Sequence, residues 1–169
     1  MIDLEKLIRD VPDFPKPGIV FKDITPLLAD PTALNEAVER LAEPFRDSGV
    51  ELVTGIESRG FIFGTPVARI LGAGFVPIRK PGRLPAEALS ESYELEYGTN
   101  VVEIHVDAIR AEQRVLMIDD LLATGGSMAA GCKLVRRLGG AVVGAAFVVE
   151  LSFLFFFNEM ETCEIYSLI

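Results

Sequence analysis

Apolar and polar positions along the chain follow two different periods, and the two periods alternate. After Asp30 and Pro31, apolar residues recur at helical spacing from Leu34 to Phe45. Aspartate suits an N-cap and proline suits a first helical turn, so the pattern predicts a helix that starts here. Pro44 is expected to end this helix, because proline interrupts helical hydrogen bonding.

Short apolar runs alternate with helical patterns in the rest of the chain. The runs predict strands at residues 51–56, 74–78, 114–119 and 141–151, and the helical patterns predict helices at 3–10, 60–71 and 126–138. Apolar strands separated by helices indicate a mostly parallel central sheet with helices on both faces. The expected fold class is therefore α/β. The segments 91–97 and 100–106 predict a hairpin added to this sheet.

Composition narrows the class of protein. The 169 residues suit one domain with its own core, and half of them are hydrophobic. A net charge of −9 argues against nucleic acid as a partner. No apolar run approaches the length of a membrane span, and the N-terminus MIDLEKLIRD is too acidic for a signal peptide. The two cysteines lack the spacing of a metal site or a disulfide framework. We expect a cytoplasmic protein without membrane contact.

The stretch VLMIDDLLATGGS, residues 115–127, carries the strongest chemical signal. Four apolar residues lead into Asp119 and Asp120, and a glycine turn follows. In parallel sheets, ligands bind at the carboxyl ends of strands, in loops that enter helices. Free amides at the start of such a helix, with the hydroxyls of Thr124 and Ser127, suit a phosphate dianion. Two carboxylates repel an anion but accept hydrogen bonds from a vicinal diol. The stretch therefore predicts a site for a ribose 5-phosphate.

Other protein classes also place polar residues beside a turn of this kind. A nucleotide P-loop needs a GxxxxGK pattern, which this stretch lacks. Response-regulator receivers carry an acidic pair after their first strand and a phosphoacceptor aspartate after the third. Here the pair falls late in the chain, and no phosphoacceptor is placed before it. The order of apolar strand, acidic pair and TGGS therefore favours a ribose-phosphate site.

Basic residues follow two earlier strands of the predicted sheet. Arg59 lies in the loop after one strand, and Arg79, Lys80 and Arg83 lie in the loop after the next. Each of them alone is typical of a solvated surface charge. Because the carboxyl ends of parallel strands meet at one edge of a sheet, all four are expected near Asp119. An acidic protein that binds phosphates needs such a local concentration of cations.

The chain resembles the type I phosphoribosyltransferases, and within them the branch that uses adenine. The resemblance rests on the segments FPKPGIVFKDITPLL, GIESRGFIFG, GFVPIRKPGRLP, YELEYG and VLMIDDLLATGGSMAAG, which occur in the family's order from about residue 14 to residue 152. It implies the family's fold and transfer of a 5-phosphoribosyl group from phosphoribosyl pyrophosphate to N9 of adenine, which yields AMP and pyrophosphate with Mg²⁺. It also implies a homodimer of single domains over residues 1–169, each with a hood at about 1–30 and a lid at about 79–97.

The resemblance assigns a role to each motif residue. The ribose 5-phosphate would be bound by Asp119, Asp120, Ala123, Thr124, Gly125, Gly126 and Ser127. Pyrophosphate would be bound by Ser58, Arg59, Arg79, Lys80 and Arg83, and adenine by Val20, Phe21, Lys22 and Leu121. Glu96 would act as a general acid or base, with Arg59 and Lys80 as further catalytic residues. Mg²⁺ would be held mainly by substrate oxygens and water, near Asp119 and Asp120.

Pattern alone allows simpler roles for some residues. Glu96 alternates with its apolar neighbours, as on any half-exposed strand. Val20, Phe21 and Lys22 follow a Pro-Gly turn and are typical of a core or a strand edge. The segment 153–157 departs from the family's pattern, and its phenylalanines predict burial, a subunit contact or an aggregation hazard.

One position bears on the choice of base. Ala123 stands where transferases for 6-oxopurines typically carry an aspartate that handles the ring proton, which favours adenine over guanine, hypoxanthine and xanthine. A transferase for another purine base is one alternative. A non-catalytic, nucleotide-sensing regulator with the same fold is another. Such regulators usually add a DNA-binding domain or a basic RNA-binding face, and the acidic 169-residue chain argues against both.

Overall fold

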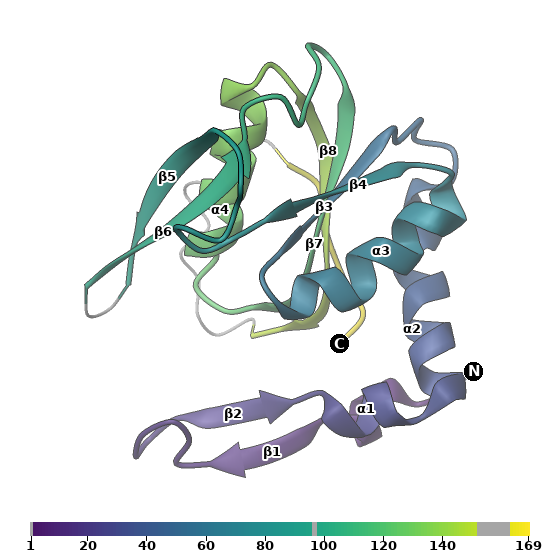
Figure 1. Cartoon of the computed structure of the whole chain (residues 1–169). Coiled ribbons are helices and arrows are strands. Elements are labelled where there is room, and N and C mark those ends of the chain that lie inside the picture. Colours follow the sequence, from purple (N-terminus) through teal and green to yellow (C-terminus); the bar gives the residue numbers. More distant parts are fainter. Residues whose placement is uncertain (1, 96–97, 152–162) are drawn as a thin grey trace.

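A five-stranded parallel sheet forms the centre of the molecule. The computed structural model describes residues 2–95, 98–151 and 163–169. The sheet has the order β4-β3-β7-β8-β9, and every neighbouring pair is parallel (Figure 1). Its strands are β3 (Leu52–Ile56), β4 (Gly74–Ile78), β7 (Arg114–Leu122), β8 (Ala141–Glu150) and β9 (Ile165–Ser167). The α/β class and the parallel sheet predicted from the sequence are confirmed.

Helices cover both faces of this sheet. On one side lie α2 (Pro31–Ala42) and α3 (Arg59–Leu71), and on the other lies α4 (Gly126–Arg137) (Figure 1). Asp30 caps α2 as predicted, because its carboxylate accepts hydrogen bonds from the amides of Thr32 (2.9 Å) and Ala33 (3.0 Å). The α2 helix ends before Pro44, which lies in the short 3-10 helix η2 (Glu43–Phe45). None of the helices among the described residues is long and apolar enough to cross a membrane.

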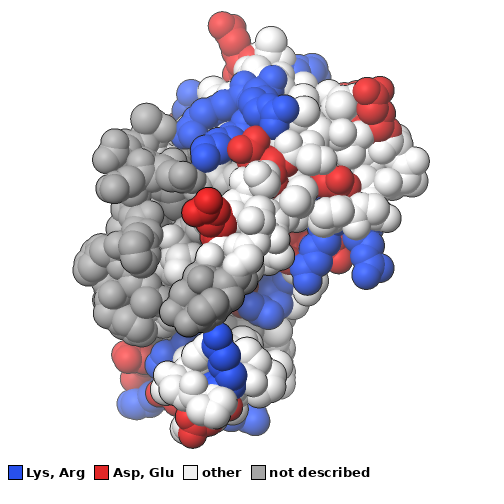
Figure 2. Space-filling model, turned by 90° about the vertical axis from the view of Figure 1, so that its left-hand side faces the viewer, with Lys and Arg blue, Asp and Glu red and all other residues white. Residues whose placement is uncertain are grey.

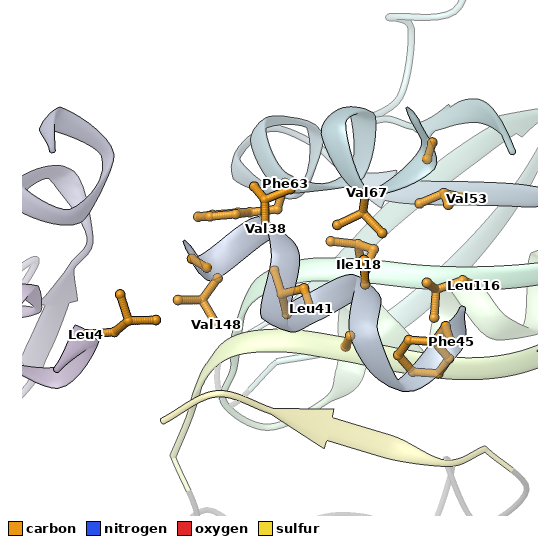
Figure 3. Packing of buried hydrophobic residues seen from close by; sticks show 14 of the residues in the cluster. Leu4, Val38, Leu41, Phe45, Val53, Phe63, Val67, Leu116, Ile118 and Val148 are labelled. Carbon is orange, nitrogen blue, oxygen red and sulfur yellow. The ribbon is translucent and has the colours of Figure 1, made fainter. Parts of the chain in front are cut away.

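Alternate residues of β7 contribute to two separate cores. Leu116 and Ile118 face α2 and α3, where they pack against Phe63 and Val67 (Figure 3). Val115 and Met117 face α4 on the opposite side. All these side chains are fully buried, which explains why the strand is apolar without interruption. Packing in the two cores holds β7 in the middle of the sheet and so positions the residues that follow Ile118.

The N-terminal segment forms a hairpin that stands apart from the sheet (Figure 1). The prediction of one helix over residues 3–10 is wrong. A 3-10 helix, η1 (Leu4–Leu7), is followed by β1 (Arg9–Pro12), which pairs antiparallel with β2 (Val20–Asp23). The helical pattern is overridden by this strand pairing, which cross-strand ion pairs between Arg9 and Asp23 and between Lys22 and Asp10 reinforce. A short helix, α1 (Thr25–Ala29), connects the hairpin to α2.

A second antiparallel hairpin packs on α4. Its strands are β5 (Ala88–Glu94) and β6 (Thr99–His105), which confirms the predicted hairpin. The first strand begins earlier than predicted, directly after the segment RKPGRLPAE, because Ala88 pairs with His105 at the far end of β6. Arg137 of α4 holds this hairpin by donating to the Ser90 carbonyl and the Glu91 carboxylate, each at 2.8 Å.

The carboxyl end of β7 differs from the boundary expected from the sequence. The strand predicted over residues 114–119 continues to Leu122, because Leu121 and Leu122 keep their pairing with β8. Asp120, which the prediction placed just after the strand, therefore lies within β7 together with Asp119. The short strand β9 was not predicted. The phenylalanine run at 153–157 lies outside the described residues.

Candidate active site

The acidic pair occupies the end of β7, at the carboxyl edge of the sheet. The side chain of Asp120 is buried, and its carboxylate pairs with Nε of Arg59. The side chain of Asp119 is half-buried, and its Oδ1 accepts a hydrogen bond of 2.9 Å from the Asp120 amide. Neighbouring strand residues point to opposite faces, so the two carboxylates have different surroundings. Asp119 retains more access to solvent than Asp120.

Gly60 allows the start of α3 to approach β7 closely. A Cβ at this position would lie 2.8 Å from the Ile118 carbonyl oxygen and 3.1 Å from Oδ1 of Asp119. A side chain there would therefore collide with backbone and with the acidic pair. This contact brings Arg59, the first residue of α3, to Asp120. The Glu57–Ser58 peptide in the preceding loop is cis.

The glycine turn leads directly into α4. Gly125 has a φ of +84° and is the N-cap of this helix, without a side chain to bond the first amides. Position 126 requires glycine for a steric reason, because a Cβ there would lie 3.0 Å from Cδ2 of Tyr93. Thr124 is exposed and Ser127 is half-buried. The start of α4 therefore lies beside the acidic pair, with Ser127 in the same cavity and first-turn amides that no side chain caps, which suits an anion.

These elements surround one cavity of about 210 Å³. It is lined by Ile56, Glu57, Ser58, Arg59, Tyr93, Asp119, Asp120, Leu121 and Ser127. The cavity brings together the loop after β3, the end of β7 and the start of α4, as the sequence predicted. Tyr93 and Glu57 are lining residues that were not predicted.

The basic residues after β4 lie beside this cavity rather than in its lining. Arg79 is held by the Glu57 carboxylate, with Nε of Arg79 3.2 Å from Oε2. Lys80 and Arg83 are exposed at the same turn. Lys and Arg also gather into a group on the upper part of the face shown in Figure 2, next to several acidic residues. A chain with a net charge of −9 thus concentrates cations locally.

Three of the predicted base-binding residues, Val20, Phe21 and Lys22, lie in the hairpin β1–β2, and the fourth, Leu121, lies on β7. The ring of Phe21 meets the ring of Phe14 edge-on, with centroids 5.3 Å apart, and the guanidinium carbon of Arg59 lies 5.8 Å from the Phe21 centroid. Val20 is 50% exposed. The ammonium of Lys22 lies 2.6 Å from the Asp10 carboxylate. Phe21 is therefore the hairpin residue that contacts the loop after β3 through Arg59.

Two carboxylates of the site have pKa values shifted in opposite directions. The amide of Lys80 and the guanidinium of Arg79 lower the pKa of Glu57. Burial, followed by the charge of Asp120, raises the pKa of Asp119 well above its usual value. A ligand that donates hydrogen bonds to Asp119, or brings a cation near it, would relieve this unfavourable charge.

Comparison with known proteins identifies the family. The model of the phosphoribosyl transferase domain matches residues 28–152. An adenine phosphoribosyltransferase of Thermobifida fusca is 59% identical over 151 residues, covering 89% of this chain and 86% of the relative. One from Halothermothrix orenii is 51% identical over 168 residues, covering 99% of each chain. The chain belongs to the phosphoribosyl transferase family.

Solved structures of this family agree with the fold. Adenine phosphoribosyltransferase from Thermoanaerobacter pseudethanolicus has a TM-score of 0.95 at 52% identity, covering 99% of this chain and 97% of that one. The Saccharomyces cerevisiae enzyme, complexed with an imino-altritol bisphosphate and adenine, has a TM-score of 0.92 at 37% identity, with the same coverage. The family and the phosphoribosyltransferase fold expected from the sequence are confirmed.

The phosphoribosyl transferase motif accounts for most of the cavity. Arg59, Asp119, Asp120 and Ser127, which the local sequence predicted, line it together with Ser58 and Leu121, which the resemblance implied. Tyr93 was missed because its place depends on how the hairpin β5–β6 packs on α4; the glycine at 126, which leaves room for its ring, is the signal that points to it. Glu57 was missed although it lies in the quoted GIESRG motif. Glu96 lies outside the described residues.

Proposed function

We propose that this protein transfers the 5-phosphoribosyl group of phosphoribosyl pyrophosphate to N9 of adenine, producing AMP and pyrophosphate in purine salvage. One observation carries the proposal: an acidic pair, a helix start and an arginine meet in a single cavity. The relatives described above are adenine phosphoribosyltransferases, and their similarity to this chain supports the same reaction. Ala123, at the position of the carboxylate of 6-oxopurine transferases, supports adenine as the base.

The ribose 5-phosphate binds across the end of β7 and the start of α4. Asp119 and Asp120 face the sugar hydroxyls, while Ala123, Thr124, Gly125, Gly126 and Ser127 surround the 5-phosphate. Neutral donors and the positive end of α4 stabilise the dianion there. The raised pKa of Asp119 supports this role, because its half-buried carboxylate accepts a hydrogen bond from the Asp120 amide and sugar hydroxyls would supply further ones.

The leaving pyrophosphate lies between two basic loops. Ser58 and Arg59 belong to the loop after β3, and Arg79, Lys80 and Arg83 to the turn after β4. As the bond from C1 of the ribose to the pyrophosphate oxygen breaks, the sugar gains cationic character and the leaving group gains negative charge. The cations of Arg59 and Lys80 stabilise the negative charge that develops on the leaving pyrophosphate. They therefore act in catalysis and not only in substrate binding.

Adenine binds on the hairpin side of the cavity. Phe21 and Leu121 provide apolar surface for the ring, and backbone groups near Val20 and Lys22 contact its edge. We assign Glu96 as the general acid or base that manages the proton of the base as N9 bonds to C1. Residues 79–97 act as a lid that keeps water from the reactive sugar, and residues 1–30 form a hood over the base.

Mg²⁺ fits the chemistry of the site. Among the described residues, no cluster of three or more His, Cys, Asp or Glu side chains is positioned to hold a metal ion alone. Mg²⁺ binds oxygen ligands and retains waters, so substrate oxygens would hold it together with water, near Asp119 and Asp120. When bound, Mg²⁺ neutralises part of the charge on the pyrophosphate.

The protein is further proposed to be a cytoplasmic homodimer that binds neither nucleic acid nor membrane. The acidic composition supports the absence of nucleic acid. Ile62 on α3, 41% exposed, offers apolar surface for a second copy. Sedimentation equilibrium tests this assembly, and a monomer at micromolar concentration would contradict it.

The test of function is release of pyrophosphate from phosphoribosyl pyrophosphate with Mg²⁺, with adenine, guanine and hypoxanthine offered separately. Turnover with adenine alone, and its loss when EDTA removes Mg²⁺, is the expected result. Turnover with an oxopurine would contradict the interpretation of Ala123. Binding of phosphoribosyl pyrophosphate without turnover of any base would instead identify a nucleotide-sensing regulator.

A further inference from the structure

One carboxylate joins the two basic loops of the site. Oε2 of Glu57 accepts hydrogen bonds from Nε of Arg79 (3.2 Å) and from the Lys80 amide (3.0 Å), and Oε1 lies 3.4 Å from a terminal nitrogen of Arg79. The Glu57 amide in turn donates to the Ile78 carbonyl at 2.9 Å. The loop after β3 and the turn after β4 are thus tied by side chain and backbone together.

The remaining nitrogen of the same guanidinium points back into its own turn. It donates to the carbonyl of Arg83 at 3.0 Å, which closes the turn from Arg79 to Arg83. Nε and both terminal nitrogens of Arg79 are therefore engaged by protein oxygens. Its side chain is only 33% exposed, and that of Glu57 only 16%. Lys80 and Arg83 lie exposed at the same turn.

A second carboxylate holds the turn from the other side. Glu103 of β6 accepts hydrogen bonds from the Gly82 amide and the Ser90 hydroxyl, each at 3.1 Å. The backbones of Glu103 and Arg79 also exchange hydrogen bonds of 2.7 and 2.9 Å. The turn that carries Lys80 and Arg83 is therefore fixed at its start by Glu57 and at its middle by Glu103.

We propose that Glu57 and Arg79 form a positioning pair that sets the turn 79–83 against the loop after β3, so that Lys80 and Arg83, rather than Arg79, contact the pyrophosphate. This inference rests on the proposed function, because it assumes that pyrophosphate binds at this edge. Arg79 acts through the protein, by holding the backbone from which the two exposed cations extend. A carboxylate next to an anionic substrate is tolerated because Arg79 neutralises it.

The lowered pKa of Glu57 agrees with this arrangement. Its main cause is the hydrogen bond from the Lys80 amide, and the contacts with Arg79 and the charge of Arg83 add to it. Glu57 is therefore ionised throughout the neutral range, and the pair persists there. Glutamine at this position retains an oxygen for the Lys80 amide but loses the charge and the two-oxygen contact with Arg79.

A double-mutant cycle tests the proposal by steady-state kinetics of the full chain. Glu57→Gln, Arg79→Gln and the double variant are each expected to raise KM for phosphoribosyl pyrophosphate about tenfold, with little further loss in the double variant, because the two residues act as a unit. KM for adenine is expected to stay within about twofold of the parent value, since the hairpin that carries Phe21 is untouched. Urea unfolding of each variant checks that the fold is intact.

Glu43→Gln is the matched control. It removes the same charge from an ion pair, Glu43–Arg46 at 2.6 Å, on η2. This pair lies near Phe45, whose ring contacts Gly144 at the start of β8, so it belongs to the opposite edge of the sheet. The control is expected to keep both KM values. Glu57→Asp keeps the charge, and its KM for phosphoribosyl pyrophosphate is expected to lie between those of the parent and Glu57→Gln.

The outcomes separate the two proposals. No turnover of adenine by the parent protein overturns the proposed function itself. With an active parent, an unchanged KM in Glu57→Gln overturns the positioning pair. A much larger effect of Arg79→Gln than of Glu57→Gln, with additive losses in the double variant, would instead make Arg79 a direct ligand of pyrophosphate.

Discussion

Arg59 and Asp120, separated by 61 positions in the sequence, form an ion pair across the floor of the cavity. The guanidinium also lies near the ring of Phe21, so one side chain links the N-terminal hairpin, the loop after β3 and the end of β7. Asp120 is buried, whereas the Arg59 side chain is 44% exposed. The buried carboxylate thus orients an arginine that remains accessible to a ligand.

Replacing Asp120 by asparagine is expected to loosen this arginine. Asparagine accepts a hydrogen bond but carries no charge, and a charged hydrogen bond contributes about 1.5–3 kcal/mol. Since Arg59 is partly solvated, the lower end applies, and KM for phosphoribosyl pyrophosphate is expected to rise about tenfold. Initial rates at varied substrate concentration measure this. Glu39→Gln, which weakens an exposed pair with Arg46, serves as the control, and an unchanged KM in Asp120→Asn would refute the orienting role.

Replacing Asp119 by asparagine is expected to stabilise the fold while impairing turnover. Between the usual pKa of an unfolded aspartate, about 3.9, and the raised pKa of Asp119, the folded chain retains a proton that the unfolded chain has released. The stability of the parent therefore falls as pH rises through this interval. Asparagine carries no charge to bury, so the Asp119→Asn variant should be more stable than the parent at pH 7.

Urea midpoints at pH 7 and at pH 4 measure this difference. The gain of Asp119→Asn over the parent should be full above the raised pKa and should shrink toward zero as pH approaches about 3.9. A variant that is less stable than the parent at pH 7 would show that the charge of Asp119 is favourable in the folded protein.

Alanine substitutions at Gly60 and Gly64 are expected to distinguish a loss of stability from a loss of activity. Alanine at 64 brings its Cβ to 2.7 Å from Cε2 of Phe75, a ring that can move, while alanine at 60 meets the Ile118 backbone and Asp119. Both variants are expected to lose about 1–3 kcal/mol of stability. Only Gly60→Ala should also lose activity at a temperature where it is folded. Equal specific activity of the two folded variants would contradict the close approach of α3 to the acidic pair.

Phe21→Ala is expected to weaken adenine binding. Stacking of a base on an aromatic ring contributes about 1–3 kcal/mol, so KM for adenine should rise about tenfold. Phe14 is 51% exposed, and Phe14→Ala removes its edge contact with Phe21. This variant should change KM for adenine less than about threefold, which is the effect of losing a weak aromatic contact. Equal effects of both variants would indicate that the hairpin as a whole, rather than Phe21, matters.

The acidic pair and the glycine turn were predictable because strand, carboxylates and helix start are contiguous in sequence. Residues brought together by packing were not. Tyr93 reaches the cavity only because β5 packs on α4, and Glu57 acquires its role only when Arg79 arrives on the neighbouring strand. The helical pattern near Arg9 failed for the same reason, since its partner strand ends at Asp23. Local sequence patterns predict individual helices and strands. Contacts between segments that are distant in the sequence decide which residues pair with one another, and they can override a local pattern.

The position of β7 between β3 and β8 also constrains how the protein acquires activity during synthesis. The strand that carries both aspartates pairs with β3, made some sixty residues earlier, and with β8, which ends at Glu150. Every residue that lines the cavity is made before β8, but β7 lacks one of its two neighbouring strands until β8 has emerged from the ribosome, so we expect the site to become stable only then. Substrate that binds the folded site is therefore expected to stabilise chains that have completed β8 more than shorter ones.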